Sequence, residues 1–141
     1  MGKKILDNIK VSKLKIIKVP QGNIMKALNK SELKKWTFGE AYFSKIKFGK
    51  IKAWKYHKKM NLQLVVPSGK VKFVFFSKKN NKFKVIEIGE KKYSRITVPA
   101  KIWFGFKGVS KKESIILSIT NIKHNKKEIL RCKKNEIKYK W

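Results

Sequence analysis

Hydrophobic and polar positions alternate along most of the chain, in short runs that end at glycine, proline or asparagine. The clearest run, residues 51–76, predicts a strand, a turn and two further strands. In the last of these strands Val71, Phe73 and Phe75 occupy every second position. Side chains at alternate positions share one face of a strand, so this spacing predicts a core face.

The same alternation predicts roughly nine or ten short strands over the whole chain, with turn residues every 8–12 positions. The Gly49-Lys50 and Asn80-Asn81 pairs are predicted hairpin turns, and Ser31 is expected to cap a single helical turn. Evenly spaced short strands without a convincing helix predict an all-β sandwich or barrel, of which the jelly roll is one form. We expect one domain over residues 1–141. Strands are expected at residues 11–19, 24–28, 40–48, 73–77, 83–88, 95–98, 103–106 and 114–120.

The charge of the chain is extreme. Lys and Arg number 38 against 8 Asp and Glu, which gives a formal net charge of +30. Nucleic-acid readers depend on Arg for bidentate contacts, yet the basic residues here are Lys except for Arg95 and Arg131. A lysine excess beside many Ile, Asn and Phe is typical of a codon bias toward A and T, so nucleic acid is a weak third alternative. That alternative predicts one continuous basic face and binding that falls steeply with salt.

Other residue types limit the chemistry. Cys132 is the single cysteine, which fits a reducing compartment, and no apolar run reaches the ~20 residues of a membrane span. A cytoplasmic protein that does not enter membranes is therefore expected. The histidines are His57 and His124 alone, and no acidic residue lies between Glu40 and Glu87. A metal site is therefore not expected, and no cofactor motif is present.

The strand that begins at Ile51 holds the best candidates for catalysis. His57 can take up and release a proton near neutral pH, and even spacing puts Lys55 on the same face. Lys52 falls on the opposite face unless a bulge intervenes. A lysine that faces a barrel interior needs an anionic ligand or a carboxylate. The alternatives are a solvent-facing Lys55 and a partly buried His57 that only satisfies a hydrogen bond.

Aromatic residues and the second histidine remain open to two interpretations. Trp54 and Trp103 are expected in the core or in a pocket wall. Tyr42 and Tyr56 can donate protons, although tyrosines in strands more often pack. His124 follows a strand end, where it either faces a barrel mouth or lies in a solvated loop.

Four segments, in this order, resemble the dTDP-4-dehydrorhamnose 3,5-epimerase family of cupins. They are GEAYFSKIKFGKIKAWKYHKKMNLQLVVPSGKVKFVFF (39–76), RITVPAKIWFGFKG (95–108), SIILSITNIKHN (114–125) and EIKYKW (136–141). The resemblance implies a metal-independent jelly-roll homodimer. Such enzymes epimerise nucleotide-linked 4-keto-6-deoxy sugars by removing protons next to the ketone, and their products feed surface polysaccharides. Related small cupins are nucleotide-sugar 3,4-ketoisomerases.

The resemblance also assigns roles to residues. The Arg-Gly-Leu-His-Tyr stretch of the family falls on residues 52–56, so Lys52 is expected to pair with the diphosphate. Lys55 stands where the family has its catalytic His, and His57 matches the second His of the ketoisomerase His-x-His pattern. The Ala-His-Gly-Phe segment falls on residues 103–106, and no Tyr lies near residues 119–122, where the family has its general acid.

The sequence therefore predicts a nucleotide-sugar epimerase or isomerase in which Lys55 or His57 moves the proton. The remaining residues expected to contact the substrate are Glu40, Tyr42, Trp103 and His124. A non-catalytic nucleotide-sugar-binding cupin is the alternative, because the catalytic His and Tyr of the family are not matched.

Overall fold

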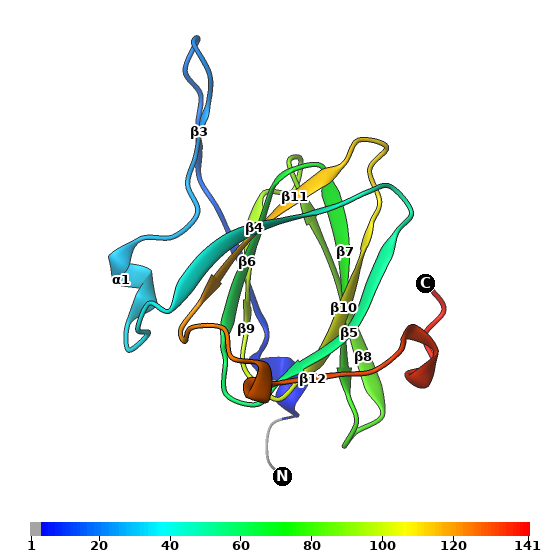
Figure 1. Cartoon of the computed structure of the whole chain (residues 1–141). Helices are drawn as coiled ribbons and strands as arrows, with labels where there is room; N and C mark the ends of the chain where they lie inside the picture. The colour runs from blue at the N-terminus through cyan, green and yellow to red at the C-terminus, as the bar shows by residue number, and fades with distance from the viewer. Residues whose placement is uncertain (1–3) are drawn as a thin grey trace.

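The computed structural model describes residues 4–141, in which two five-stranded antiparallel sheets face each other (Figure 1). The strand orders are β1-β9-β6-β11-β4 and β12-β5-β10-β7-β8, and a β2-β3 ribbon projects from the body (Figure 1). This architecture confirms the all-β jelly-roll prediction. The strands are β1 (Lys10–Lys13), β2 (Ile16–Ile17), β3 (Ile24–Met25), β4 (Glu40–Ile46), β5 (Ile51–His57), β6 (Leu62–Ser68), β7 (Lys70–Ser77), β8 (Lys82–Gly89), β9 (Ser94–Val98), β10 (Trp103–Gly108), β11 (Ser114–Thr120) and β12 (Ile129–Arg131).

Helical structure in the described chain is limited to single turns. The turn α1 (Lys30–Leu33) is capped by Asn29, whose side chain accepts a hydrogen bond from the amide of Glu32 at 3.2 Å. The cap expected at Ser31 is therefore wrong by two positions, since Asn is as good an N-cap as Ser. Short 3₁₀ turns cover Ile5–Asn8, Lys126–Glu128 and Lys134–Glu136. No helix over residues 4–141 has the length and apolar character needed to cross a membrane.

The two predicted hairpins have different outcomes. Asn80-Asn81 does connect the paired strands β7 and β8, as predicted. Gly49-Lys50 does not close a hairpin, because β4 pairs with β11 whereas β5 pairs with β10 and β12. Gly49, with φ +75°, donates its amide to the carbonyl of Gly108 at 2.8 Å and leads the chain from one sheet to the other.

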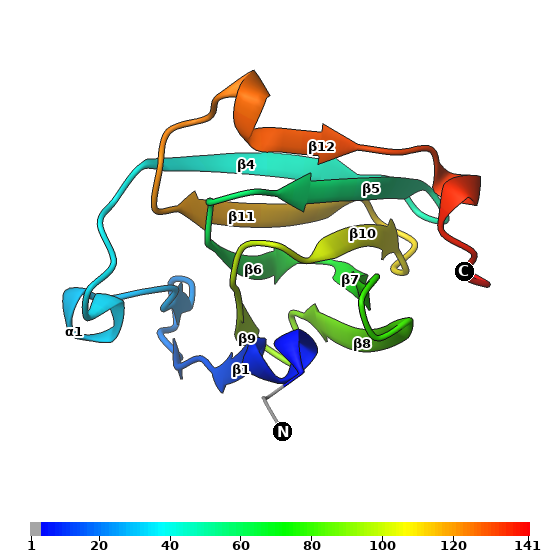
Figure 2. The same cartoon turned by 90° about the horizontal axis from the view of Figure 1, so that it is seen from below.

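The core lies between the two sheets. Val71, Phe73 and Phe75 on β7 are buried there, as their alternation predicts. Val74 and Phe76, on the opposite face of β7, are buried as well, because the C-terminal segment covers that face. Figure 2 shows this segment outside the sheet that contains β5. Its packing residues are Ile137, Tyr139 and Trp141.

Candidate active site

A cavity of about 360 Å³ lies between the two sheets, beside β5. Its apolar walls are the inner faces of β6, β7, β10 and β11. Its polar groups are hydroxyls from β4 and β11 and three cations from β5 and β12. The apolar lining is Ala53, Trp54, Leu62, Leu64, Phe73, Phe104, Phe106, Ile116 and Cys132. The polar lining is Tyr42, Ser44, Ser118, Lys52, Lys55 and Arg131.

A shift in strand register explains why two lysines three positions apart both reach this cavity. Lys55 lies opposite Phe104 on β10, and Lys52 lies opposite Phe106, with an irregularity between the two pairs. Residues opposite each other in an antiparallel pair share a face, and Phe104 and Phe106 both face inward. The bulge that the sequence left open is therefore present. A Cβ on Gly105 would lie 2.6 Å from the Cβ of Ala53, so this close approach requires glycine.

Arg131 completes a cluster of three cations around the amine of Lys55. It lies opposite Lys55 where β12 pairs with β5. Burial lowers the pKa of Lys55, and the positive charges of Arg131 and Lys52 lower it further. The Lys52 amine donates to the carbonyl of Lys45 at 2.8 Å. None of the described residues that line the cavity is a carboxylate, so Lys55 has no counter-charge there.

His57 lies behind the cavity wall and is not among the residues that line it. The residue is 5% exposed, and its ring stacks on Phe104 with the ring centroids 5.9 Å apart. Nδ1 of His57 is 2.9 Å from Oε1 of Glu128, 71 residues further along the chain. Burial lowers the pKa of His57, and the hydrogen bond with Glu128 opposes but does not reverse this effect.

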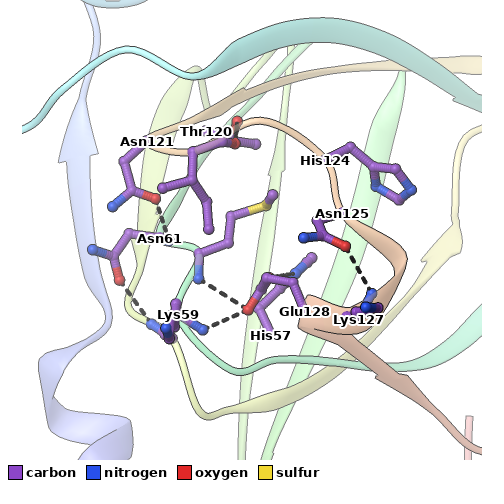
Figure 3. A network of polar contacts seen from close by, with 12 residues as sticks. His57, Lys59, Asn61, Thr120, Asn121, His124, Asn125, Lys127 and Glu128 are labelled. Atoms are coloured by element: carbon purple, nitrogen blue, oxygen red, sulfur yellow. Dashed lines mark hydrogen bonds and ion pairs between the residues drawn. The ribbon is translucent and has the colours of Figure 1, made fainter.

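Glu128 binds more than the histidine. Its second carboxylate oxygen accepts hydrogen bonds from the amides of Lys59 and Met60 (Figure 3). Burial opposes the charged form, but these amides and His57 together lower the pKa of Glu128. The pair therefore consists of a neutral imidazole and an ionised carboxylate, and it fixes the loop that follows β5.

The structure separates the other predicted substrate contacts. Tyr42 lines the cavity from β4, directly opposite Ser118 on β11. Glu40 lies at the start of β4, outside the cavity lining, where its carboxylate accepts the amide hydrogen of His124 at 3.2 Å. Trp103 lies on the outer face of its sheet, with its ring centroid 5.2 Å from that of Tyr56.

Sequence reasoning did not assign a site role to Arg131 or Glu128. Both belong to scarce residue types in this chain, the two Arg and the eight acidic residues, and that scarcity was the available signal. Nothing local pairs Glu128 with His57. Among residues 4–141, no group of three or more His, Cys, Asp or Glu side chains is arranged as possible metal ligands.

Comparison with known proteins gives a fold but no match of sequence. No protein-family model matches the chain, and no curated protein matches it. A dTDP sugar isomerase from Desulfovibrio desulfuricans is similar in structure, with a TM-score of 0.86 and 24% identity over 92% of this chain and 86% of that one.

Two further solved structures are similar. A dTDP-6-deoxy-D-glucose-3,5-epimerase from Legionella pneumophila, in complex with dTDP-4-keto-L-rhamnose, has a TM-score of 0.83 and 13% identity over 96% of this chain and 79% of that one. A sugar 3,4-ketoisomerase from Thermoanaerobacterium thermosaccharolyticum, in complex with TDP, has a TM-score of 0.77 and 16% identity over 94% and 93%. The chain therefore has the cupin fold of dTDP-sugar epimerases and isomerases, as the sequence resemblance predicted.

Proposed function

We propose that the protein is a cytoplasmic nucleotide-sugar epimerase or isomerase of one cupin domain that acts without a metal or cofactor. Its substrate is a dTDP-4-keto-6-deoxyhexose or a close analogue, and its product enters surface polysaccharides. The observation that carries the proposal is the cavity, whose lining combines apolar walls with the half-buried Lys55 and the exposed Lys52 and Arg131, without a carboxylate among the described lining residues. The fold shared with enzymes named as dTDP-sugar epimerases and isomerases supports it.

The three cations have different roles in this proposal. Lys52 and Arg131 bind the diphosphate, since both are charged groups at the cavity wall. Lys55 takes the proton from the carbon next to the ketone, because burial and its neighbours lower its pKa toward the range of a useful base. The Tyr42 hydroxyl serves as the proton donor. Positive charge beside the ketone stabilises the enolate that forms.

His57 remains the alternative base, but its position favours Lys55. Phe104 lines the cavity and stacks on His57, which itself is nearly fully buried. Contacts of the substrate with Glu40, Trp103 and His124 stay predictions. Glu40 and His124 lie together at one end of β4, whereas Trp103 faces outward.

The test is turnover of dTDP-4-keto-6-deoxyglucose in deuterium oxide. We expect deuterium at the carbon that is inverted, or at the carbon that receives the proton in a ketoisomerisation, measured by mass spectrometry and NMR. A panel of 4-keto nucleotide sugars extends the test beyond one substrate. Absence of deuterium from every member of the panel would remove the enzymatic proposal.

A non-catalytic nucleotide-sugar-binding cupin is the second candidate. Lys55 and Phe104 occupy the positions where the family resemblance leads one to expect histidines, and no tyrosine lies at residues 119–122. This candidate predicts that dTDP and a dTDP-sugar bind, as measured by calorimetry, while no carbon-bound hydrogen exchanges. Binding combined with exchange would contradict it.

We also propose a homodimer. β4 is an edge strand of its sheet, and three phenylalanines on or beside it are exposed by more than half: Phe38 (67%), Phe43 (69%) and Phe48 (56%). Exposed apolar side chains on an edge strand and in the segments that flank it favour contact with a partner. Light scattering coupled to size exclusion is expected to give twice the chain mass. A Phe43→Ser variant is expected to shift the protein toward monomer, and a monomeric wild type would contradict the proposal.

A further inference from the structure

The group that stands nearest the proposed chemistry is a primary amine, which can do more than accept a proton. Lys55 lies inside a cavity whose walls include Leu64, Phe73 and Phe104. A neutral lysine amine adds to ketones, and such lysines occur in apolar pockets or beside other cations. An arginine or a protonated lysine cannot react in this way.

We propose that Lys55 forms a Schiff base with the ketone of the substrate, and that the isomerisation proceeds through this covalent intermediate. The proposal rests on the proposed function for the identity of the ketone. It requires an amine at the cavity wall, neighbours that favour the neutral form of the amine, and a group that can relay protons. Arg131 and Lys52 are the neighbours, and Tyr42 is the relay.

The neighbours of Lys55 favour the reactive form of its amine. Arg131 lies directly across the strand pair and Lys52 is on the same inner face, so each charge opposes protonation of Lys55. Burial acts in the same direction and is the largest cause of the lowered pKa. No carboxylate among the described lining residues offsets these effects.

The steps balance without any further reactant. The Lys55 nitrogen attacks the carbonyl carbon, a C–N bond forms, and the carbonyl oxygen takes up a proton to give a carbinolamine. The carbinolamine oxygen takes a further proton from the Tyr42 hydroxyl and leaves as water, which breaks the C–O bond and gives a protonated imine and a Tyr42 phenolate. This cation acidifies the adjacent C–H, whose proton returns through the released water to the phenolate, so in this route Lys55 is the nucleophile and Tyr42 is the base. The resulting enamine is reprotonated on its other face, and water then restores the ketone and the amine.

Lys82 provides a matched control within the chain. It is the other described lysine whose pKa is lowered, in its case by the adjacent Lys4. Lys82 is exposed at the start of β8 and does not line the cavity. If a lowered pKa were sufficient, Lys82 would react with the ketone as Lys55 does. The proposal also requires the cavity that holds the ketone, so Lys55 is expected to react faster than Lys82.

The experiment is reductive trapping on the full-length protein. Incubation with dTDP-4-keto-6-deoxyglucose and sodium cyanoborohydride is expected to give one adduct, which intact mass and peptide mapping place on Lys55. Labelling of Lys55 should be at least about tenfold faster than labelling of any other lysine, Lys82 included. The adduct should vanish in Lys55→Arg and persist in Lys82→Arg. Absence of an adduct, or equal labelling of many lysines that Lys55→Arg leaves unchanged, overturns the proposal.

A second measurement separates this inference from the proposed function. Each cycle of imine formation and hydrolysis exchanges the ketone oxygen with water, so wild type should release ¹⁸O from labelled substrate about tenfold or more faster than Lys55→Arg. Deuterium exchange without trapping or oxygen exchange means proton transfer without an imine, which overturns this inference alone. Trapping at Lys55 without deuterium exchange supports imine formation but removes the isomerase, and with it the passage of an isomerisation through the imine. Failure of all three measurements removes both.

Discussion

A buried cation and a half-buried cation in this protein have opposite surroundings. Arg95 is 4% exposed, and its guanidinium donates to the side chain of Gln63 at 2.9 Å, to the carbonyl of Ala27 at 2.8 Å and to the carboxylate of Glu32 at 2.7 Å. Lys55 lies in the cavity, where the described lining supplies two further cations and no carboxylate.

The difference shows which of the two cations has a purely structural role. A buried charge must be paired, or it must shift its pKa and become neutral. Arg95 is paired, and by its bonds it ties α1 and the chain before it to the sheet that contains β9. Lys55 is not paired, so its pKa is lowered and the position is one that a ligand or a reaction can use.

The largest effect is expected from Lys55→Arg, which keeps a cation in the cavity but removes a group that can lose its proton. Arginine stays protonated, so deuterium exchange into dTDP-4-keto-6-deoxyglucose should fall by about 10²–10⁴-fold. The exposed Lys111→Arg is the matched control and should retain the wild-type rate. A wild-type exchange rate in Lys55→Arg would contradict Lys55 as the base and favour His57.

The free energy of unfolding should depend more on Arg95 than on Lys55, whereas the exchange rate should depend on Lys55. Arg95→Met removes the ion pair with Glu32 and the hydrogen bonds to Gln63 and Ala27, and should lower the free energy of unfolding by about 2–4 kcal/mol. Lys55→Met removes an unpaired amine from an apolar cavity and should leave this free energy unchanged or raised. Urea denaturation followed by tryptophan fluorescence measures both. Equal losses would show that Lys55 has a structural partner after all.

Acid should weaken the fold through the buried His57–Glu128 pair. The pKa of His57 is lowered by burial, so below the ordinary value of about 6.5 the unfolded chain takes up a proton before the folded one does. This stability is complete above pH 6.5 and is lost as the pH falls toward the folded pKa. Glu128 adds a second loss that begins near the ordinary value of about 4.3 and continues downward through its own lowered pKa.

Urea denaturation at a series of pH values checks this expectation. In His57→Gln the upper part of the decline should disappear, while His124→Gln, on an exposed loop, should keep the wild-type profile. An unchanged profile in His57→Gln would contradict the assignment.

The smallest effect concerns the pH dependence of exchange. The rate should rise as Lys55 loses its proton, with a midpoint below the ordinary lysine value of about 10.4. The positive charge of Arg131 lowers the pKa of Lys55. Its removal in Arg131→Gln favours the protonated form of Lys55, so the midpoint should move to higher pH. The exposed Lys123→Gln is the control. A midpoint that Arg131→Gln leaves in place would show that the charge of Arg131 does not act on Lys55.

Much of the fold followed from local pattern. Alternation located β11 at Ser114–Thr120 and the core face of β7, and Asn80-Asn81 identified a true hairpin. The Gly49-Lys50 turn was misassigned because a glycine turn fixes the direction of the chain but not the strand that will pair with it. In the structure β4 and β5 follow each other in the chain but lie in different sheets.

The candidate site was predictable only in part. The strand at residues 51–57 was recognised, and Lys52 and Lys55 both line the cavity. Their common face depends on a register shift against β10, which strict alternation along β5 cannot reveal. Arg131 and Glu128 reach this region because β12 returns along β5, a contact between segments far apart in sequence.

The sequence by itself determined most of the strands and the core face of β7, because a period of two is a local property of the extended chain, and its family resemblance implied the jelly-roll class. Tertiary structure decided which strands pair, that three cations meet without a described carboxylate, and that His57 is paired behind the wall of Phe104. Those outcomes depend on burial and on the electrostatic field of neighbours, and both exist only once the two sheets have packed together.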